Sequence, residues 1–127
     1  MKNARVLIAD DDSYILQFLS DHLSDDCCVV GTVSEGKALT AAAMELHPHI
    51  IITDIDMPTM DGLTAIRQIE ALMPDSKVIV LTDHEEPELA EEAIAAGASA
   101  FLIKNGSPEL IGKIKAIIRD LTREALG

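Results

Sequence analysis

The chain has 127 residues, of which 48% are hydrophobic, so residues 1–127 should form a single domain with a sizeable core rather than a disordered chain. It carries 10 Lys and Arg against 22 Asp and Glu, a net charge of −12. So acidic a chain repels phosphate backbones, and we expect no direct binding to DNA or RNA.

The two cysteines, Cys27 and Cys28, are adjacent and cannot supply a disulfide framework, so they read as ordinary thiols of a reducing compartment. The N-terminus has only four apolar residues in a row before Asp10, which is too short for the core of a signal peptide. No apolar run approaches the length of a membrane span. We therefore expect a cytoplasmic protein without membrane contact.

Five short apolar runs punctuate the chain and are candidate strands. In chain order they cover residues 6–9, 29–30, 50–52, 78–81 and 101–103. All but the second are continuous rather than alternating, which is typical of strands buried on both faces. Such strands belong to a parallel sheet that is covered by helices on either side.

Apolar residues at helical spacing fill the intervals between these runs. In chain order, the five sets are Ile15, Leu16, Leu19 and Leu23; Leu39, Ala42, Ala43 and Leu46; Leu63, Ile66, Ile69 and Leu72; Leu89, Ala93 and Ala96; and Leu110, Ile111, Ile114, Ile117, Ile118 and Leu121. Boundary signals accompany them. These are Pro48 after the second set, Pro74 after the third, Gly97 as the cap of the fourth, and Ser107 as N-cap with Pro108 at the start of the fifth.

Strand therefore alternates with helix five times, which predicts an α/β fold with a doubly wound, five-stranded parallel sheet. The expected strand order is 2-1-3-4-5, the flavodoxin-like order. Right-handed crossovers then put the first and fifth helices on one face of the sheet and the other three on the opposite face.

Ligands of such sheets bind outside the carboxyl ends of the strands. The first strand runs into residues 10–12, three aspartates, and the third into Asp54 and Asp56, while the fourth ends at Thr82 and the fifth at Lys104. Clustered carboxylates need a cation, and a small oxygen-rich site suits Mg²⁺, whereas the ligands and central glycine of a Ca²⁺ loop are absent. A carboxylate oxygen there could attack phosphorus, with Thr82 and Lys104 offsetting charge on the phosphoryl oxygens.

Each of these residues also has an ordinary explanation. Asp12 is a candidate helix N-cap, with Ser13 beside it as a second candidate, and a lone Thr or Lys at a strand end usually has no role. The coincidence of four strand ends is what favours a site. The four histidines, His22, His47, His49 and His84, lack metal-ligand spacing and read as surface or packing residues, but His84 follows Thr82 closely.

These segments resemble the receiver domain of two-component response regulators over essentially the whole chain. The matching segments are residues 6–12 with the acidic pair, residues 50–62 with the phosphoacceptor strand and its loop, residues 80–82, and residues 101–104. The resemblance implies that a sensor histidine kinase transfers a phosphoryl group from phosphohistidine to Asp54. Asp11, Asp54 and the backbone carbonyl of Asp56 would then bind Mg²⁺ directly, with Asp10 acting largely through water.

The resemblance further implies a signalling switch rather than an enzyme, one that catalyses only its own phosphorylation and slow dephosphorylation. Thr82 and Phe101 would be the switch pair. Residues 72–78 and the lack of a proline after Lys104 are most similar to receivers that precede a LuxR-type DNA-binding domain, which would be an output domain outside this chain.

Three departures from the family pattern bear on the site. Asn105 stands where a proline with a cis bond is common, and a cis bond before a non-proline residue costs roughly 3–4 kcal/mol, so the geometry of the Lys104–Asn105 bond stays open. Asp83 stands where a small residue is usual, and Asp56 adds a carboxylate beside the pocket. We expect Asp56, Asp83 and His84 to modulate reaction rates.

Two other functions fit less well. A phosphatase of the haloacid dehalogenase type also uses an Asp-x-Asp motif, a Thr and a Lys, but it begins with that motif and has a further acidic motif after the lysine. A phosphorylation-independent interaction domain usually lacks the acidic pair, the Thr or the Lys, all of which are present here.

The distribution of charge suggests a homodimer that forms on phosphorylation. Residues 83–92 carry six acidic and no basic residues, whereas residues 113–123 carry four basic residues and one acidic residue. An acidic helix of one copy could meet the basic helix of another.

Overall fold

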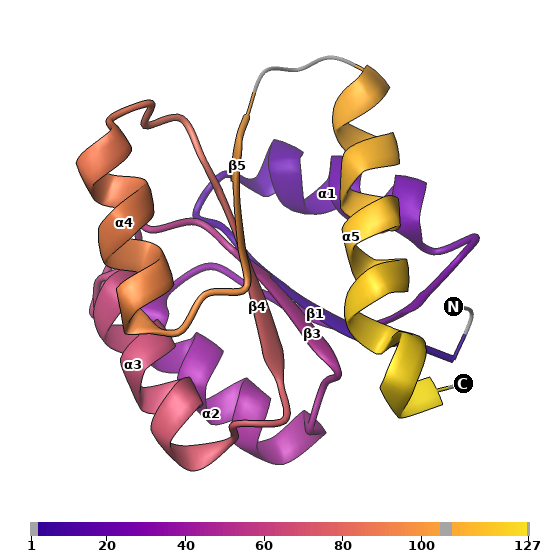
Figure 1. Cartoon of the computed structure of the whole chain (residues 1–127), viewed down its shortest axis with the longest axis horizontal. Helices are drawn as coiled ribbons and strands as arrows, with labels where there is room; N and C mark the ends of the chain where they lie inside the picture. Colours follow the sequence, from indigo (N-terminus) through magenta and orange to yellow (C-terminus); the bar gives the residue numbers. More distant parts are fainter. Residues whose placement is uncertain (1–2, 105–107, 127) are drawn as a thin grey trace.

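The computed structural model describes residues 3–104 and 108–126, which form one parallel sheet covered by helices on both faces (Figure 1). The strands are β1 (Arg5–Ala9), β2 (Cys28–Val33), β3 (Ile50–Thr53), β4 (Lys77–Thr82) and β5 (Ala100–Ile103). Their order in the sheet is β2-β1-β3-β4-β5, and every neighbouring pair is parallel. The predicted fold class and strand order are confirmed.

The helices are α1 (Ser13–Leu23), α2 (Gly36–Leu46), α3 (Gly62–Leu72), α4 (Pro87–Ala96) and α5 (Pro108–Leu126). As predicted, α1 and α5 cover one face of the sheet, and α2, α3 and α4 cover the other (Figure 1). Within the described part of the chain, none of the helices is long and apolar enough to cross a membrane.

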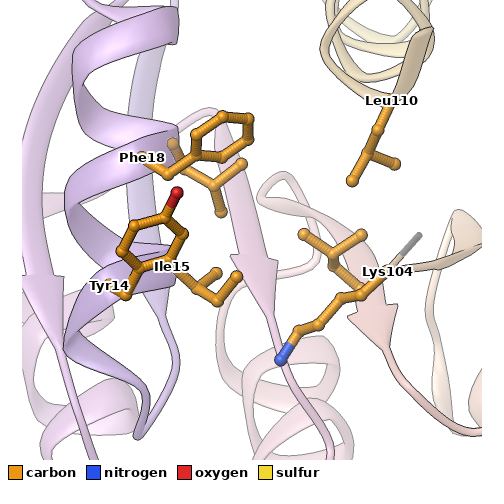
Figure 2. Close-up of a pocket in the computed structure, with 7 residues that line it drawn as sticks. Tyr14, Ile15, Phe18, Lys104 and Leu110 are labelled. Carbon is orange, nitrogen blue, oxygen red and sulfur yellow. The ribbon is translucent and has the colours of Figure 1, made fainter. Parts of the chain in front are cut away.

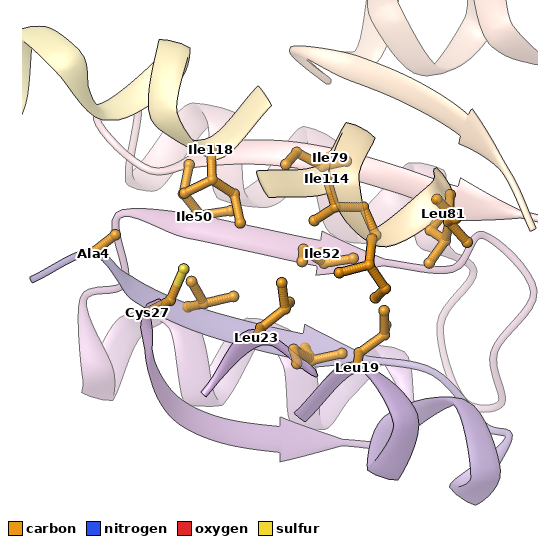
Figure 3. Close-up of a cluster of buried hydrophobic side chains, with 14 residues drawn as sticks. Ala4, Leu19, Leu23, Cys27, Ile50, Ile52, Ile79, Leu81, Ile114 and Ile118 are labelled. Carbon is orange, nitrogen blue, oxygen red and sulfur yellow. The ribbon is translucent and has the colours of Figure 1, made fainter. Parts of the chain in front are cut away.

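Each face of the sheet has its own aliphatic core, because alternate residues of the central strands point to opposite sides. On the side of α1 and α5, four strand residues meet four helix residues: Ile50, Ile52, Ile79 and Leu81 meet Leu19, Leu23, Ile114 and Ile118 (Figure 3). On the other side, Ile51, Val78 and Val80 pack with residues of α2, α3 and α4. This two-sided burial explains why the central strands read as continuous apolar runs.

The edge strand β2 is longer than the apolar run at residues 29–30 from which it was predicted. Its apolar pair, Val29 and Val30, is half-buried, and the strand extends from Cys28 to Val33 with an irregular register opposite Val6 and Leu7. A strand paired on one side buries less surface than a central one, so its pattern is weaker. Both cysteines are free, with Cys27 in the core and Cys28 exposed.

The expected helix boundaries are found where the chain is described. Asp12 is the N-cap of α1 and accepts a hydrogen bond from the Tyr14 N–H, while Ser13 is the first helical residue. α2 ends before His47 and Pro48, and Gly97 caps α4 at a φ of 125°. Ser107, the predicted N-cap of α5, lies outside the described residues, and the helix begins at Pro108.

The loop between β3 and α3 packs against the beginning of α2, which has no hydrogen bond from a capping side chain of its own. The Gly36 N–H donates to the Pro58 carbonyl at 3.0 Å, and the Lys37 N–H donates to the Thr59 hydroxyl at 3.2 Å. Two backbone donors of the first turn of α2 are therefore satisfied by a loop that follows another strand.

The same loop is held tightly at its other end by Gly62, the first residue of α3. Its N–H donates to the Ile55 carbonyl at 2.7 Å. A Cβ at this position would lie 2.6 Å from the Asp54 carbonyl oxygen and 2.6 Å from the Ile55 Cα, which is too close for any side chain. Gly112, in the middle of α5, differs because a Cβ there would meet no atom within 4 Å.

We therefore expect opposite effects from the same substitution at two glycines. Gly62→Ala should lower the free energy of unfolding by roughly 1–3 kcal/mol, because the backbone has to move to make room. Gly112→Ala should raise it by roughly 0.5–1 kcal/mol, because alanine favours the helix and meets open space. Urea denaturation measures both, and effects of equal sign would contradict this description of the loop.

Candidate functional site

Four strands bring polar side chains to the carboxyl edge of the sheet, as the sequence predicts. Asp10 follows β1, Asp54 follows β3, Thr82 ends β4, and Lys104 follows β5. The Lys104 Nζ lies 2.6 Å from the Asp10 Oδ2 and 2.9 Å from the Asp54 Oδ2. Residues as much as 94 positions apart therefore form one contiguous site.

The centre of the site is a cluster of three carboxylates. Asp10, Asp11 and Asp54 each offer an oxygen, and these oxygens lie within 4.8 Å of one another. Asp10 and Asp54 are buried, at 2% and 7% exposure, and Asp11 opens to solvent. The three carboxylates carry three negative charges and the Lys104 ammonium carries one positive charge, so two negative charges remain uncompensated. An all-oxygen donor set with this charge fits a hard divalent cation.

The Asp54 carboxylate is fixed in orientation by contacts to both of its oxygens. Its Oδ1 accepts hydrogen bonds from the backbone N–H groups of Ile55 at 2.6 Å and Asp56 at 3.3 Å. Its Oδ2 accepts one from Lys104. Asp10 is held similarly, since its Oδ1 accepts from the Asp12 N–H at 2.9 Å and its Oδ2 contacts Lys104. Both buried acids are thus preorganised before any ligand binds.

The pKa values of Asp10 and Lys104 are both shifted, by burial and by the contacts between them. Burial raises the pKa of Asp10, and the hydrogen bonds from Lys104 and Asp12 only partly offset this effect. Burial alone would lower the pKa of Lys104, but the hydrogen bonds to Asp10 and Asp54 and the negative charges of these carboxylates together outweigh burial and raise the pKa above its ordinary value. Lys104 is therefore charged throughout the physiological pH range.

Thr82 and Phe101, the predicted switch pair, lie on neighbouring strands. Thr82 is fully buried, and its hydroxyl accepts a hydrogen bond from the His84 N–H at 3.3 Å. Phe101 is half-buried and packs on the core cluster beneath α2, α3 and α4, with Val80 as its partner in the strand register. Thr82 is thus bonded to the loop that precedes α4, and Phe101 packs on the core beneath that helix.

A contact that the sequence does not predict joins two loops at the rim of the site. The His84 Nε2 contacts the Asp56 Oδ2, and its Nδ1 lies 3.5 Å from the Glu86 Oε2. The hydrogen bond to Asp56 and the charge of that carboxylate raise the pKa of His84. The side chain of Asp56 is consequently turned toward His84, and the carboxylate cluster in the described residues consists of Asp10, Asp11 and Asp54. Asp83 is exposed.

The bond between Lys104 and Asn105, whose geometry the sequence leaves open, lies outside the described residues. Beside the Lys104 side chain, between α1 and α5, lies a small apolar cavity of about 90 Å³ (Figure 2). Its walls include Tyr14, Phe18 and Leu110, and the stem of Lys104 completes them. The Tyr14 and Phe18 rings stack with centroids 6.4 Å apart. Sequence periodicity alone did not single out this cavity.

Comparisons with known proteins agree with this geometry. Residues 6–115 match the response regulator receiver domain family. The transcriptional regulatory protein YesN of Bacillus subtilis is 32% identical over 124 residues, which is 94% of this chain and 34% of YesN. The chemotaxis protein CheY of Thermotoga maritima is 34% identical over 108 residues, which is 84% of this chain and 90% of CheY. The chain thus spans about a third of the longer relative and nearly all of the shorter.

Solved structures give the same picture. The signal receiver domain of the putative response regulator NarL from Mycobacterium tuberculosis superposes with a TM-score of 0.86 at 25% identity, covering 96% of this chain and 98% of that one. The isolated receiver domain of RcsB from Salmonella enterica, solved with the phosphoryl mimic BeF3−, gives 0.84 at 29% identity, covering 93% and 89%. From its fold, its strand-end site and these matches, this chain belongs to the response regulator receiver domain family of two-component systems.

Proposed function

We propose that Asp54 is the phosphoacceptor of this receiver domain and that the phosphoryl group comes from the phosphohistidine of a sensor histidine kinase. The main support is the Asp54 carboxylate itself, which is buried in an acidic cluster and held by the Ile55 N–H on one oxygen and by Lys104 on the other. A carboxylate fixed in this way can attack phosphorus with little reorganisation.

In the proposed reaction, an Asp54 oxygen forms a bond to phosphorus while the P–N bond to the imidazole of the donor breaks. Mg²⁺, held by Asp11, Asp54 and the Asp56 backbone carbonyl, with Asp10 acting through water, would neutralise charge on the phosphoryl oxygens. The Lys104 ammonium, already 2.9 Å from Asp54, stabilises the same oxygens. The Thr82 hydroxyl is the third group that faces the transferred phosphoryl group.

The proposed switch follows from the position of Thr82. When its hydroxyl donates to a phosphoryl oxygen, the end of β4 and the loop that contains His84 move with it. Phe101, on the adjacent strand, then repacks against the core beneath α4. Asp56, Asp83 and His84 border this path, and we propose that they tune its rates.

The wider role is that of a signalling domain. Receiver domains act in two-component systems, and we propose that this one controls an output domain or partner, for which a LuxR-type DNA-binding domain is the leading candidate. Residues 3–104 and 108–126 form a single sheet with its covering helices, which supports one domain over residues 1–127. The chain would then catalyse only its own phosphorylation and slow dephosphorylation, unlike a haloacid dehalogenase-type phosphatase or an inert interaction domain.

The first prediction concerns the acceptor. Asp54→Asn should abolish labelling by acetyl phosphate with Mg²⁺, a loss of more than about a hundredfold, because an amide cannot attack phosphorus. Asp56→Asn is the matched control and should still take up one acid-labile phosphoryl group per chain. Intact-mass spectrometry measures both, and stoichiometric labelling of Asp54→Asn would refute the assignment.

The second prediction concerns the cation. Mg²⁺ should stabilise the unphosphorylated protein, because it relieves repulsion within the carboxylate cluster and binds the folded state. At about ten times its Kd, the gain is about 1.4 kcal/mol, or roughly 5 °C in melting temperature. Asp11→Ala should remove most of this shift. A wild-type protein whose melting temperature ignores millimolar Mg²⁺ would contradict the cation site.

We also propose that a second copy of the chain is a partner after phosphorylation. Glu88, Glu91 and Glu92 are exposed on α4, and Lys113 and Arg119 are exposed on α5. The other two basic residues of α5 are already engaged within the chain, since Lys115 pairs with Asp26 at 2.5 Å and Arg123 with Asp120 at 2.8 Å. The basic surface available to a partner is therefore centred on Lys113 and Arg119.

Beryllofluoride, a phosphoryl mimic, should accordingly raise the mass measured by light scattering at low salt, and high salt should reverse it, because exposed charges are screened within about 8–10 Å at physiological ionic strength. Reversing Lys113 and Arg119 to Glu should prevent dimerisation. Reversing Lys37 and Lys77 to Glu changes the net charge equally away from α5 and should not. A mimic-bound monomer at every salt concentration would rule out the dimer.

A further inference from the structure

The contact between His84 and Asp56 raises a question about the cation site, because it engages a carboxylate that stands next to that site. The Asp56 N–H donates to the Asp54 Oδ1 at 3.3 Å, so the backbone of Asp56 lies at the rim of the carboxylate cluster. Its side chain is 68% exposed and is directed to His84 instead of the cluster. Most of this side chain therefore borders solvent rather than packed protein.

If the Asp56 carboxylate were released from His84, its interaction with the cluster would depend on whether a divalent cation is bound. Without a cation, the excess negative charge of the cluster repels a fourth carboxylate. With a cation in place, that repulsion is offset, and a nearby carboxylate becomes an additional ligand. The imidazole of His84 therefore competes with the cation for the same carboxylate.

The position of His84 suits it to this competition. Its backbone N–H is tied to the Thr82 hydroxyl, and Glu86 lies beside its Nδ1, so the ring is held from two directions while its Nε2 meets Asp56. The side chain is itself 40% exposed, and its two acidic partners, Asp56 and Glu86, lie in the loops at the rim of the site. Its contacts are thus local to the rim of the site.

We propose that His84 is a positioning residue that keeps the Asp56 carboxylate off the bound cation, so that a coordination position stays free for the phosphoryl oxygen. This inference rests on the proposed function, because it concerns the same cation and the same acceptor. A fourth carboxylate on the cation would strengthen cation binding. It would also occupy the position of an incoming phosphoryl oxygen and add negative charge against an anionic donor.

The proposal predicts that one substitution strengthens Mg²⁺ binding and at the same time slows phosphorylation. His84→Ala should bind Mg²⁺ about tenfold more tightly, the effect of one added charge–charge contact near the protein surface. At saturating Mg²⁺ it should accept phosphoryl groups from phosphoramidate about tenfold more slowly. Isothermal titration calorimetry measures the first and intact-mass kinetics the second. General damage to the site would weaken binding and slow phosphorylation together.

Two further variants separate the release of Asp56 from the loss of the imidazole itself. In Asp56→Asn/His84→Ala the backbone carbonyl of residue 56 is kept but the fourth carboxylate is gone, so both changes should disappear. His84→Gln keeps an N–H donor for Asp56 and should lie near wild type in both measurements. Melting curves of each variant verify that it is folded.

Each outcome decides the proposal. Unchanged Mg²⁺ affinity in His84→Ala overturns it, and so does tighter binding that persists in the double variant, because the imidazole would then act through its charge alone. A wild-type protein that binds no Mg²⁺ and takes up no phosphoryl group would instead refute the proposed function, and this inference with it. Tighter binding with slower phosphorylation, both reversed in the double variant, is the result that we expect.

Discussion

The ammonium group of Lys104 is the constraint on which the site depends. Bringing Asp10 and Asp54 together at the edge of the sheet removes two carboxylates from water, which is costly unless they are paired. Lys104 pairs with both at once, and it can do so because β5 delivers it to the same edge as β1 and β3. The single ammonium group of Lys104 balances only one of the three negative charges of Asp10, Asp11 and Asp54, and the remaining negative charge is the basis of the proposed cation site.

The rest of the fold serves to keep these strand ends in register. The central strands are buried on both faces by aliphatic side chains, so they form a rigid platform, and polarity is concentrated where the strands stop. The site therefore has two parts, one at the strand ends and one in the loops at the rim. Asp10, Asp54, Thr82 and Lys104 stand on or beside the strands, whereas Asp56 and His84 belong to the loops that follow β3 and β4.

The sequence contained most of the fold and the inner part of the site, because both depend on local patterns. Apolar runs mark the central strands, and polar residues just after four of the five runs mark the site. The extent of β2 could not be predicted, because an edge strand such as Cys28–Val33 is only half-buried and therefore has a weaker pattern of apolar residues. The contact of His84 with Asp56 could not be predicted from the sequence either. It joins residues 28 positions apart in two loops, and nothing local to either residue specifies the other. The cavity beside Lys104 is formed by two helices and depends on their packing.

The beginning of α2 is bound to the loop that follows Asp54. Because Pro58 and Thr59 accept hydrogen bonds from Gly36 and Lys37, any displacement of that loop strips two amides of the helix of their acceptors. The exchange of these amide protons with solvent should therefore depend on a segment more than 20 residues away in the sequence.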